Sequence, residues 1–212
     1  MKIDQFVVDD FLQKWESGFL CLHPTDTIPG ISFNPQSELA YASLLELKKR
    51  PANKTCICLV NSLSIALEQW AALPDGWVDS LKELWPGSLT VVWQAKTKHP
   101  LVRDDGTIAL RCPSISAETP LIAEVLSKTS GLFPSTSVNL SGEPSFTDWK
   151  QAKDFLSKFQ GNIFTPDLDL GASCNRLPST IIKILYSGSY EMIREGALRK
   201  DQIDKVIEVT NT

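Results

Sequence analysis

A run of cations closes one of the segments that we expect to be helical: Lys48, Lys49 and Arg50 stand together, and Lys54 follows. If residues 38–50 form a helix, consecutive side chains point in different directions. Lys48 and Arg50 are two apart, however, and at a helix end the backbone can turn both toward one pocket. An arginine fork and a lysine point charge together suit a polyphosphate. A solvated basic helix end, which the helix macrodipole favours, is the alternative.

The stretch STSVNLSG, residues 135–142, places four hydroxyl groups and one carboxamide directly after the apolar-leaning GLFP. In an extended segment the side chains alternate, so Ser135, Ser137 and Asn139 share one face. Such neutral donors and acceptors can hold ribose hydroxyls, a carboxylate or a phosphate without burying a charge. A serine-rich turn is the alternative interpretation.

A second polar group stands in PTDTIPG, residues 24–30, where Thr25, Asp26 and Thr27 form a tight turn after a predicted strand. In α/β sheets, ligands usually bind outside the carboxyl ends of the strands. The turn therefore indicates a place where a ligand could lie. Ordinary turn chemistry explains the same residue types and stays open.

Arginines stand in or at the end of two predicted strands. Arg111 lies in GTIALRC, residues 106–112, and alternation puts Thr107 on the same side of that strand. Among apolar neighbours such an arginine needs a partner, or a face open to ligand or to solvent. Arg194 ends another strand, and Ser179 lies in a turn. Taken singly, those two residues are more simply explained by surface positions.

Several other chemistries find no support in the sequence. The chain has neither a GxSxG nucleophile elbow nor a GxxxxGK[ST] phosphate loop. Its five cysteines include no CxxC pair, and only His23 and His99 could join them as zinc ligands, so we expect no metal site. The simpler interpretation is that the cysteines are small buried hydrophobic groups in a reducing compartment. They are Cys21, Cys56, Cys58, Cys112 and Cys174.

The elements that must position these groups follow from hydrophobic periodicity. We expect helices over 4–17, 38–50, 62–71, 75–85, 120–131, 147–159 and 199–208. We expect strands over 19–23, 55–60, 88–95, 107–112, 132–137, 179–185 and 190–195. Helices and strands mostly alternate, but some strands follow each other directly, which predicts a layered α/β fold with a mixed sheet. Residues 1–212 are predicted to form a single domain.

Composition limits the class of protein. The 212 residues are 42% hydrophobic and 22% charged, with a net charge of −4, which disfavours a wholly basic footprint for nucleic acid but leaves room for a local basic patch. The sequence contains no run of 18 apolar residues, so we expect no membrane span. The N-terminus is acidic and amphipathic rather than a secretory signal, so we expect a cytoplasmic protein that does not associate with a membrane.

Taken together, these stretches resemble the threonylcarbamoyl-AMP synthase family, also called the YrdC-like domain. The matching motifs occur in the family's order: PTDTxxG, KxR, WPGSLT, TIALRCP, STSxNLSG, PST and RxG. They extend from residue 19 to about residue 198. The resemblance implies a twisted mixed α/β sheet flanked by helices with a large, positive, concave cavity.

The resemblance also implies an activity. The family converts L-threonine, bicarbonate and ATP to L-threonylcarbamoyladenylate and pyrophosphate, with Mg²⁺ bridging the ATP phosphates. The product feeds the formation of N6-threonylcarbamoyladenosine on tRNA, which a separate threonylcarbamoyl transferase complex completes. ATP, L-threonine and bicarbonate are therefore the expected ligands, and tRNA and the transferase complex are further expected partners.

Site residues follow from the resemblance by matching position. Lys48 and Arg50 would hold the ATP phosphates, while Ser137 and Asn139 would orient the nucleotide and the carbamate, and these four form the catalytic set. The threonine set is Thr25, Thr27, Arg111 and Ser135, with Arg111 on the carboxylate. The remaining ATP contacts are Lys54, Thr107, Ser179 and Arg194.

The chain departs from the family pattern at three places: Pro29 stands before the glycine of the first turn, Lys54 and Thr55 replace Asn-Pro, and Leu59 stands where a histidine is frequent. One alternative is a related enzyme that forms a carbamoyl adenylate without threonine specificity. Another is an RNA-binding YrdC-like protein, which the acidic net charge and the lack of aromatic residues among the cations disfavour.

Overall fold

The computed structural model describes residues 3–49, 56–116, 119–129, 132–168 and 177–210. Its helices are α1 (Gln5–Glu16), α2 (Glu38–Lys48), α3 (Leu63–Gln69), α4 (Trp77–Leu84), α5 (Pro120–Lys128), α6 (Trp149–Leu156) and α7 (Lys200–Thr210). Its strands are β1 (Leu20–His23), β2 (Gly30–Ser32), β3 (Ile57–Leu59), β4 (Leu89–Gln94), β5 (Thr107–Arg111), β6 (Phe133–Ser137), β7 (Ile163–Phe164), β8 (Thr180–Ile184) and β9 (Tyr190–Arg194).

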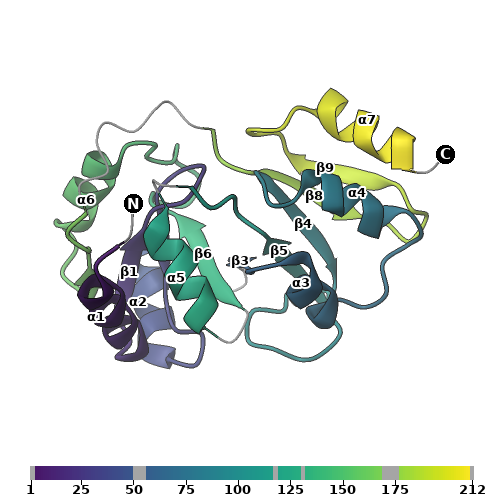
Figure 1. The fold of residues 1–212 in the computed structure, drawn as a ribbon. Helices are drawn as coiled ribbons and strands as arrows, with labels where there is room; N and C mark the ends of the chain where they lie inside the picture. The colour runs from purple at the N-terminus through teal and green to yellow at the C-terminus, as the bar shows by residue number, and fades with distance from the viewer. Residues whose placement is uncertain (1–2, 50–55, 117–118, 130–131, 169–176, 211–212) are drawn as a thin grey trace.

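The strands of the described residues form one mixed sheet in the order β7-β1-β2-β6-β3-β5-β4-β8-β9. Three neighbouring pairs, β1/β7, β3/β5 and β4/β8, are parallel, and the other five are antiparallel. The predicted mixed α/β sheet is thereby confirmed. The two halves of the sheet, which meet at β3, are strongly twisted relative to each other (Figure 1).

Helix capping explains where two of the helices end. The Ser37 side chain accepts a hydrogen bond from the Ala40 amide at the start of α2, as is usual for serine at this position. That helix ends at Lys48, and the next residue, Lys49, has a left-handed φ of 47°. We predicted that α5 would extend to a glycine at residue 131, which was wrong. The helix ends at Lys128 because Thr129 is extended, and both its amide and its hydroxyl donate to the Val125 carbonyl.

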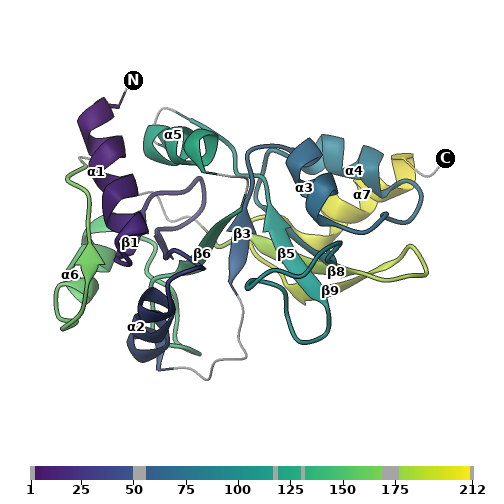
Figure 2. The ribbon, with the colours of Figure 1, turned by 90° about the horizontal axis from the view of Figure 1, so that it is seen from below.

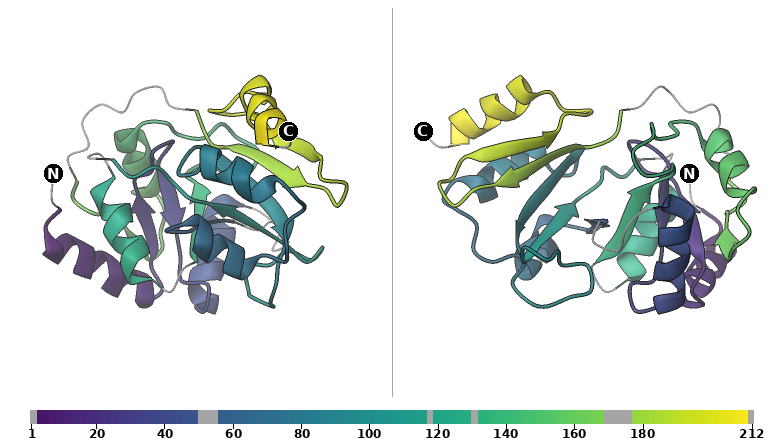
Figure 3. Two further views of the ribbon diagram at one scale, coloured as in Figure 1. Left: turned by 45° about the vertical axis from the view of Figure 1, so that its right-hand side comes forward. Right: turned by 180° about the vertical axis from the view of Figure 1, so that it is seen from behind.

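Two apolar clusters cover the sheet. One packs α1 and α5 on Cys21, Leu59 and Phe133, which lie on the same face of β1, β3 and β6. The other, larger cluster contains buried side chains of the remaining helices. Figure 2 shows α1 and α5 side by side over one half of the sheet, and α3, α4 and α7 together at its other end. The right-hand view of Figure 3, from behind, shows α7 lying above β8 and β9 at one end of the twisted sheet.

The face under α1 and α5 becomes polar toward the middle of the sheet. Leu59 lies opposite Phe133 in the antiparallel β3/β6 pair and beside Arg111 in the parallel β3/β5 pair. Residues paired across a sheet share a face, so the apolar packing at Phe133 continues through Leu59 to the guanidinium of Arg111. None of the helices in the described part of the chain is long and apolar enough to cross a membrane.

Candidate functional site

A cavity of about 200 Å³ lies on this polar part of the sheet. Its walls come from the loop between β1 and β2, from strands β2, β3, β5, β6, β8 and β9, and from the segments that precede β3, β5 and β8. Seven of the predicted site residues line it. They are Thr25, Thr27, Arg111, Ser135, Ser137, Ser179 and Arg194.

Lys48 reaches this wall from the end of α2. Its ammonium donates hydrogen bonds to the Ser137 carbonyl, at 2.6 Å, and to the Asn139 Oδ1, at 2.7 Å. The Ser137 hydroxyl donates to the same Asn139 oxygen at 2.6 Å. The structure therefore brings together three of the four predicted catalytic residues, from positions far apart in the sequence. The fourth, Arg50, lies outside the described residues, as does Lys54.

The turn after β6 is folded around Asn139. The side-chain nitrogen of Asn139 donates to the Glu143 carbonyl at 2.6 Å, and the backbone amide of Ser141 donates to the Lys48 carbonyl at 2.9 Å. Gly142 has a φ of +89°, a conformation that glycine adopts without strain. The motif STSxNLSG thus forms a strand, an internally bonded turn and a link to α2, so its polar residues do more than fill a surface turn.

Arg111 is buried, with 4% of its surface exposed, so the solvent-face alternative is wrong. Its guanidinium donates to Asp26 Oδ1 at 2.5 Å, to Thr27 Oγ1 at 2.8 Å and to the Gly87 carbonyl at 3.0 Å. The other Asp26 oxygen accepts the Ser114 amide at 3.0 Å. The partner that this strand arginine needs is therefore the acidic residue of the first turn, and the pair fixes that turn against the sheet.

The two threonines of the turn continue this network. The Thr25 hydroxyl donates to the Ile28 carbonyl at 2.7 Å and accepts the Thr27 amide at 3.1 Å. Because its single proton is used, the 3.0 Å contact between the two hydroxyls has Thr27 as the donor. The hydroxyl of Thr25 is thus fully occupied within the turn, whereas that of Thr27 keeps one lone pair. Of the two, Thr27 is the better placed to bind a ligand.

The motifs PST and RxG meet at the other side of the cavity. Arg194 donates to the Ser179 carbonyl from Nη2, at 2.8 Å, and from Nε, at 3.2 Å. The Ser179 hydroxyl lies 2.9 Å from the hydroxyl of Thr90, a buried residue of β4. A β-carbon at Gly196 would overlap the Pro178 carbonyl oxygen, so the glycine permits this close approach. Both predicted residues face the cavity rather than an outer surface.

His23 is a site residue that the sequence analysis considered only as a zinc ligand. It is fully buried, and its Nε2 lies 3.0 Å from the hydroxyl of Ser135 in the cavity wall. Its Nδ1 lies 3.2 Å from the Pro24 carbonyl, and its ring contacts Phe133 edge to face. Burial lowers the pKa of His23 to about 4. The signal that could have identified it is a histidine at the end of the apolar strand LCLH.

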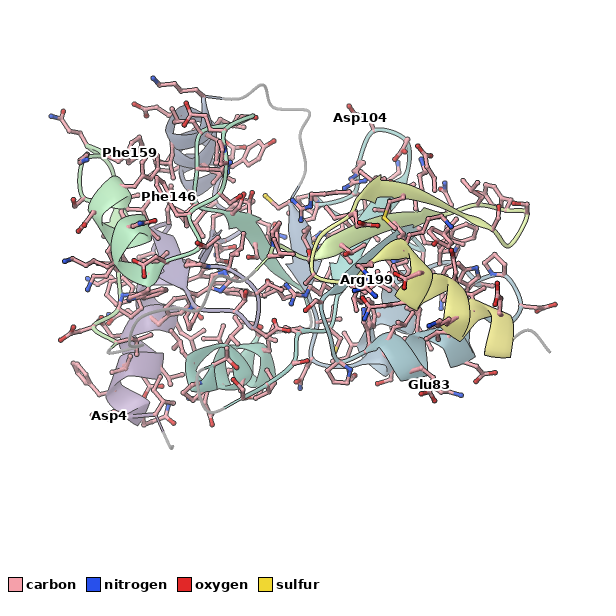
Figure 4. The ribbon with its side chains drawn as sticks, turned by 90° about the horizontal axis from the view of Figure 1, so that it is seen from above. Asp4, Glu83, Asp104, Phe146, Phe159 and Arg199 are labelled. Atoms are coloured by element: carbon pink, nitrogen blue, oxygen red, sulfur yellow. The ribbon has the colours of Figure 1, made fainter. Side chains whose placement is uncertain are left out.

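Arg103 is a second residue that was missed. It precedes β5 and lines the cavity, while its sequence neighbour Asp104 points out into solvent (Figure 4). Burial lowers the pKa of Arg103, Arg111 and Arg194 alike, since it disfavours the charged form. An anion bound between these guanidinium groups would offset that cost, so the arrangement suits carboxylate or phosphate ligands.

One predicted ATP contact lies elsewhere. The Thr107 hydroxyl donates to Asp105 Oδ1 at 2.6 Å, and the residue is buried at the start of β5 without lining the cavity. Asp105 also accepts from Lys183 at 2.9 Å. Hydrogen bonding from Thr107 and Lys183 lowers the pKa of Asp105 to about 2. Thr107 is therefore bonded to the carboxylate of an ion pair at the start of β5.

The cysteines are buried, as predicted, at the four positions that the structure describes, Cys21, Cys56, Cys58 and Cys112, and none of these forms a disulfide. Cys174 lies outside the described residues. No group of three or more His, Cys, Asp and Glu residues in the described chain could hold a metal ion. Asp26 is an acidic side chain beside the cavity, and it is hydrogen-bonded to Arg111 and to the Ser114 amide.

The chain resembles known proteins over most of its length. Residues 13–196 match the model of the Sua5/YciO/YrdC family, described as telomere recombination. A putative threonylcarbamoyl-AMP synthase of Mycobacterium tuberculosis H37Rv is 31% identical over 196 residues, which cover 92% of this chain and 86% of that protein. The threonylcarbamoyl-AMP synthase of Stenotrophomonas maltophilia is 34% identical over 66% of this chain and 75% of its own length.

Solved structures agree with the fold. The structure of Pyrococcus abyssi Sua5 complexed with L-threonine superposes with a TM-score of 0.81 and 25% identity over 98% of this chain. This chain covers 59% of that longer protein. Escherichia coli YciO superposes with a TM-score of 0.77 at 20% identity, over 94% of both chains, which supports the fold alone.

Proposed function

The chain belongs to the Sua5/YciO/YrdC family, and we propose that it is an L-threonylcarbamoyladenylate synthase. It would use L-threonine, bicarbonate and ATP and would release pyrophosphate. One observation carries the proposal: Lys48 binds Ser137 and Asn139 at the wall of a cavity that three arginines line. This combination of cations with neutral donors and acceptors matches substrates that are rich in anionic oxygens.

The size of the cavity supports separate places for threonine and for ATP. At about 200 Å³ it is smaller than the pockets that enclose whole drug-sized ligands, which span roughly 300–1,000 Å³. A small amino acid fits inside it, whereas a nucleotide triphosphate must extend beyond its mouth. We place threonine in the enclosed part, near Thr27, Arg111 and Ser135. The ATP would extend toward Arg194 and Ser179 and toward the end of α2, since Arg50 stands two residues after Lys48 in the sequence.

The first chemical step joins the amine of threonine to bicarbonate. A carbon–nitrogen bond forms, water leaves, and the product is a carbamate. Holding both reactants in one cavity removes much of the entropic barrier to their encounter. Arg111 is already paired with Asp26, so its main observed action is to hold the turn at Thr27. Its guanidinium makes three hydrogen bonds out of five N–H groups, which leaves donors for the carboxylate of threonine.

In the second step a carbamate oxygen attacks the α-phosphorus of ATP, and the bond to the bridging oxygen of pyrophosphate breaks. Negative charge moves onto the leaving pyrophosphate. Cations that are fixed before the reaction stabilise this charge without reorganisation, which is the main catalytic contribution that we propose for Arg50 and Arg194. Lys48 would act by keeping Ser137 and Asn139 in place. Mg²⁺ would arrive as part of the ATP substrate, held by phosphates and water.

An assay with purified protein tests this proposal. Protein is mixed with radiolabelled bicarbonate, ATP, Mg²⁺ and each amino acid in turn, without RNA. We expect labelled adenylate and pyrophosphate in equal amounts with L-threonine. Equal turnover with many amino acids would instead favour a carbamoyl-adenylate enzyme without threonine specificity. No turnover together with a salt-sensitive shift of RNA would favour the RNA-binding alternative.

Single substitutions test whether the activity depends on this site. Arg50→Ala should abolish the release of pyrophosphate that depends on threonine and bicarbonate, and an unimpaired variant would refute its assignment. The matched control is Lys49→Ala, which removes an adjacent, exposed cation and should leave turnover unchanged. The product would then be passed on for N6-threonylcarbamoyladenosine formation on tRNA, a step that we assign to separate transferase partners.

A further inference from the structure

His23 and Ser135 touch across an intervening strand. The sheet order is β1-β2-β6, and His23 pairs with Gly30 in β2, which in turn pairs with Ser137 in β6. Neighbouring strands lie about 4.8 Å apart, so side chains of β1 and β6 normally have a β2 side chain between them. At Gly30 that side chain is missing. A β-carbon there would lie 2.6 Å from Ser135 Oγ and 2.7 Å from His23 Nε2.

Hydrogen-bond bookkeeping assigns the protons of this pair. The His23 Nδ1 lies 3.2 Å from the Pro24 carbonyl, which can only accept, so Nδ1 carries the proton. Nε2 then presents a lone pair, and the Ser135 hydroxyl, 3.0 Å away, must donate to it. A serine hydroxyl has one proton and two lone pairs. The side of Ser135 that lines the cavity therefore offers lone pairs only.

We propose that His23 is a positioning residue that fixes Ser135 Oγ as a hydrogen-bond acceptor for an N–H or O–H group of the amino-acid substrate. This inference rests on the proposed function, because it takes an amino acid as the ligand. It predicts a division of the cavity. Anionic oxygens bind at the arginines, and the donor end of the amino acid binds at Ser135, where a carboxylate or phosphate oxygen would meet a lone pair.

The pair orients the substrate and does not relay a proton. His23 is fully buried against Phe133, and its pKa of about 4 makes it a poor base at neutral pH. A proton that left the amine of the substrate would therefore not rest on the imidazole. The role of His23 is to hold the hydroxyl proton of Ser135 away from the cavity.

Nitrogen-15 NMR of the imidazole rings tests the proton assignment without any substrate. The chain contains two histidines, so His99→Gln assigns the spectrum. We expect a protonated Nδ1 and an unprotonated Nε2 for His23 at pH 7. A proton on Nε2 would make Ser135 the acceptor from histidine and would overturn the proposal, whatever the activity of the protein.

Ligand binding tests the substrate contact. The affinities of L-threonine, 2-aminobutanoate, which lacks the hydroxyl, and 3-hydroxybutanoate, which lacks the ammonium, are measured by calorimetry for wild type, Ser135→Ala and His23→Phe. We expect both variants to bind threonine about tenfold more weakly, the loss typical of one hydrogen bond to a charged donor. ATP affinity should stay unchanged. His23→Phe keeps a ring against Phe133 while removing the acceptor.

The two analogues identify the donor. If 3-hydroxybutanoate binds equally to wild type and Ser135→Ala, the ammonium is the donor. If 2-aminobutanoate binds equally to wild type and Ser135→Ala, the hydroxyl is the donor. Either result supports the proposal. Equal weakening of all three ligands, or of none, overturns it. If wild type binds none of them, the proposed function fails and the substrate contact with it. The NMR result then still decides whether His23 fixes Ser135.

Discussion

The ammonium of Lys48 donates to the Asn139 carboxamide at 2.7 Å, across 91 positions of sequence. It also donates to the Ser137 carbonyl at 2.6 Å. A single buried cation thereby joins the end of α2 to the turn after β6. The lysine of the basic motif KxR and the polar motif SxN, which are separate features of the sequence, form one unit of the structure.

Removing this cation should cost both stability and activity. Lys48→Met removes this donor from the half-buried Ser137 carbonyl and from Asn139 Oδ1, which still accepts the Ser137 hydroxyl. We expect the free energy of unfolding to fall by about 1–3 kcal/mol, the cost of leaving one such acceptor without its donor. Pyrophosphate release should be lost. The exposed Lys49 is the control, and Lys49→Met should change stability by less than about 0.5 kcal/mol. Equal effects in urea unfolding would contradict this role of Lys48.

The buried ion pair of Asp26 and Arg111 should show strong coupling. Their side chains are 11% and 4% exposed. Removal of one partner strands the other charge, so Asp26→Asn and Arg111→Met should each destabilise the protein by about 3–5 kcal/mol. The double variant removes both charges together and should lose much less than the sum of the two. Urea unfolding of all four proteins measures the coupling, and additive losses would show that the pair is not a unit.

Much of the fold could be predicted because its elements are long enough to show a period. The predicted helices and most strands appear where apolar residues recur. β2 and β7 have three and two residues, too few for alternation to be seen, and they were missed, whereas the equally short β3 lies within the apolar run TCICLV and was predicted. Their places come from pairing with β1. That pairing is a property of the folded sheet, and no local pattern in these segments encodes it.

For the site too, one part could be predicted from the sequence and another part could not. The need of Arg111 for a partner follows from the sequence, because a charged residue in an apolar strand requires one. The identity of that partner, Asp26, follows only from the sheet order. The contact between His23 and Ser135 joins residues 112 positions apart over a glycine. It depends on β1, β2 and β6 being neighbours, which the sequence analysis did not predict.

A β-carbon at residue 196 should disturb the contact between Ser179 and Arg194, the two predicted ATP contacts at that side of the cavity. In Gly196→Ala the new carbon would overlap the Pro178 carbonyl oxygen and would lie 2.9 Å from the Ser179 carbonyl. These are backbone atoms, so the segment 178–179 and residue 196 must move apart, which should disturb the hydrogen bonds of Arg194 to the Ser179 carbonyl. We expect the KM for ATP to rise about tenfold or more, with a smaller change in the KM for threonine.

Another glycine provides the control for this substitution. Gly188, in the turn between β8 and β9, has a φ of +86°, and no atom lies within 4 Å of the position that a β-carbon would take there. Gly188→Asn should leave both KM values unchanged, because asparagine tolerates left-handed geometry. An ATP KM that is unaffected by Gly196→Ala would argue against nucleotide contact at Ser179 and Arg194.

The buried imidazole of His23 should make stability depend on pH. Its pKa is about 4 in the folded protein against an ordinary value of 6.5, so between these values the unfolded chain binds more protons. Its contribution is therefore complete above pH 6.5 and is lost as the pH falls toward 4, by up to roughly 3 kcal/mol at 1.36 kcal/mol per pKa unit. Urea unfolding of wild type and His23→Phe from pH 7.5 to 4.5 measures it. Carboxylates and His99 titrate in both proteins and cancel in the difference, so a difference that stays flat across this range would contradict a neutral, buried His23.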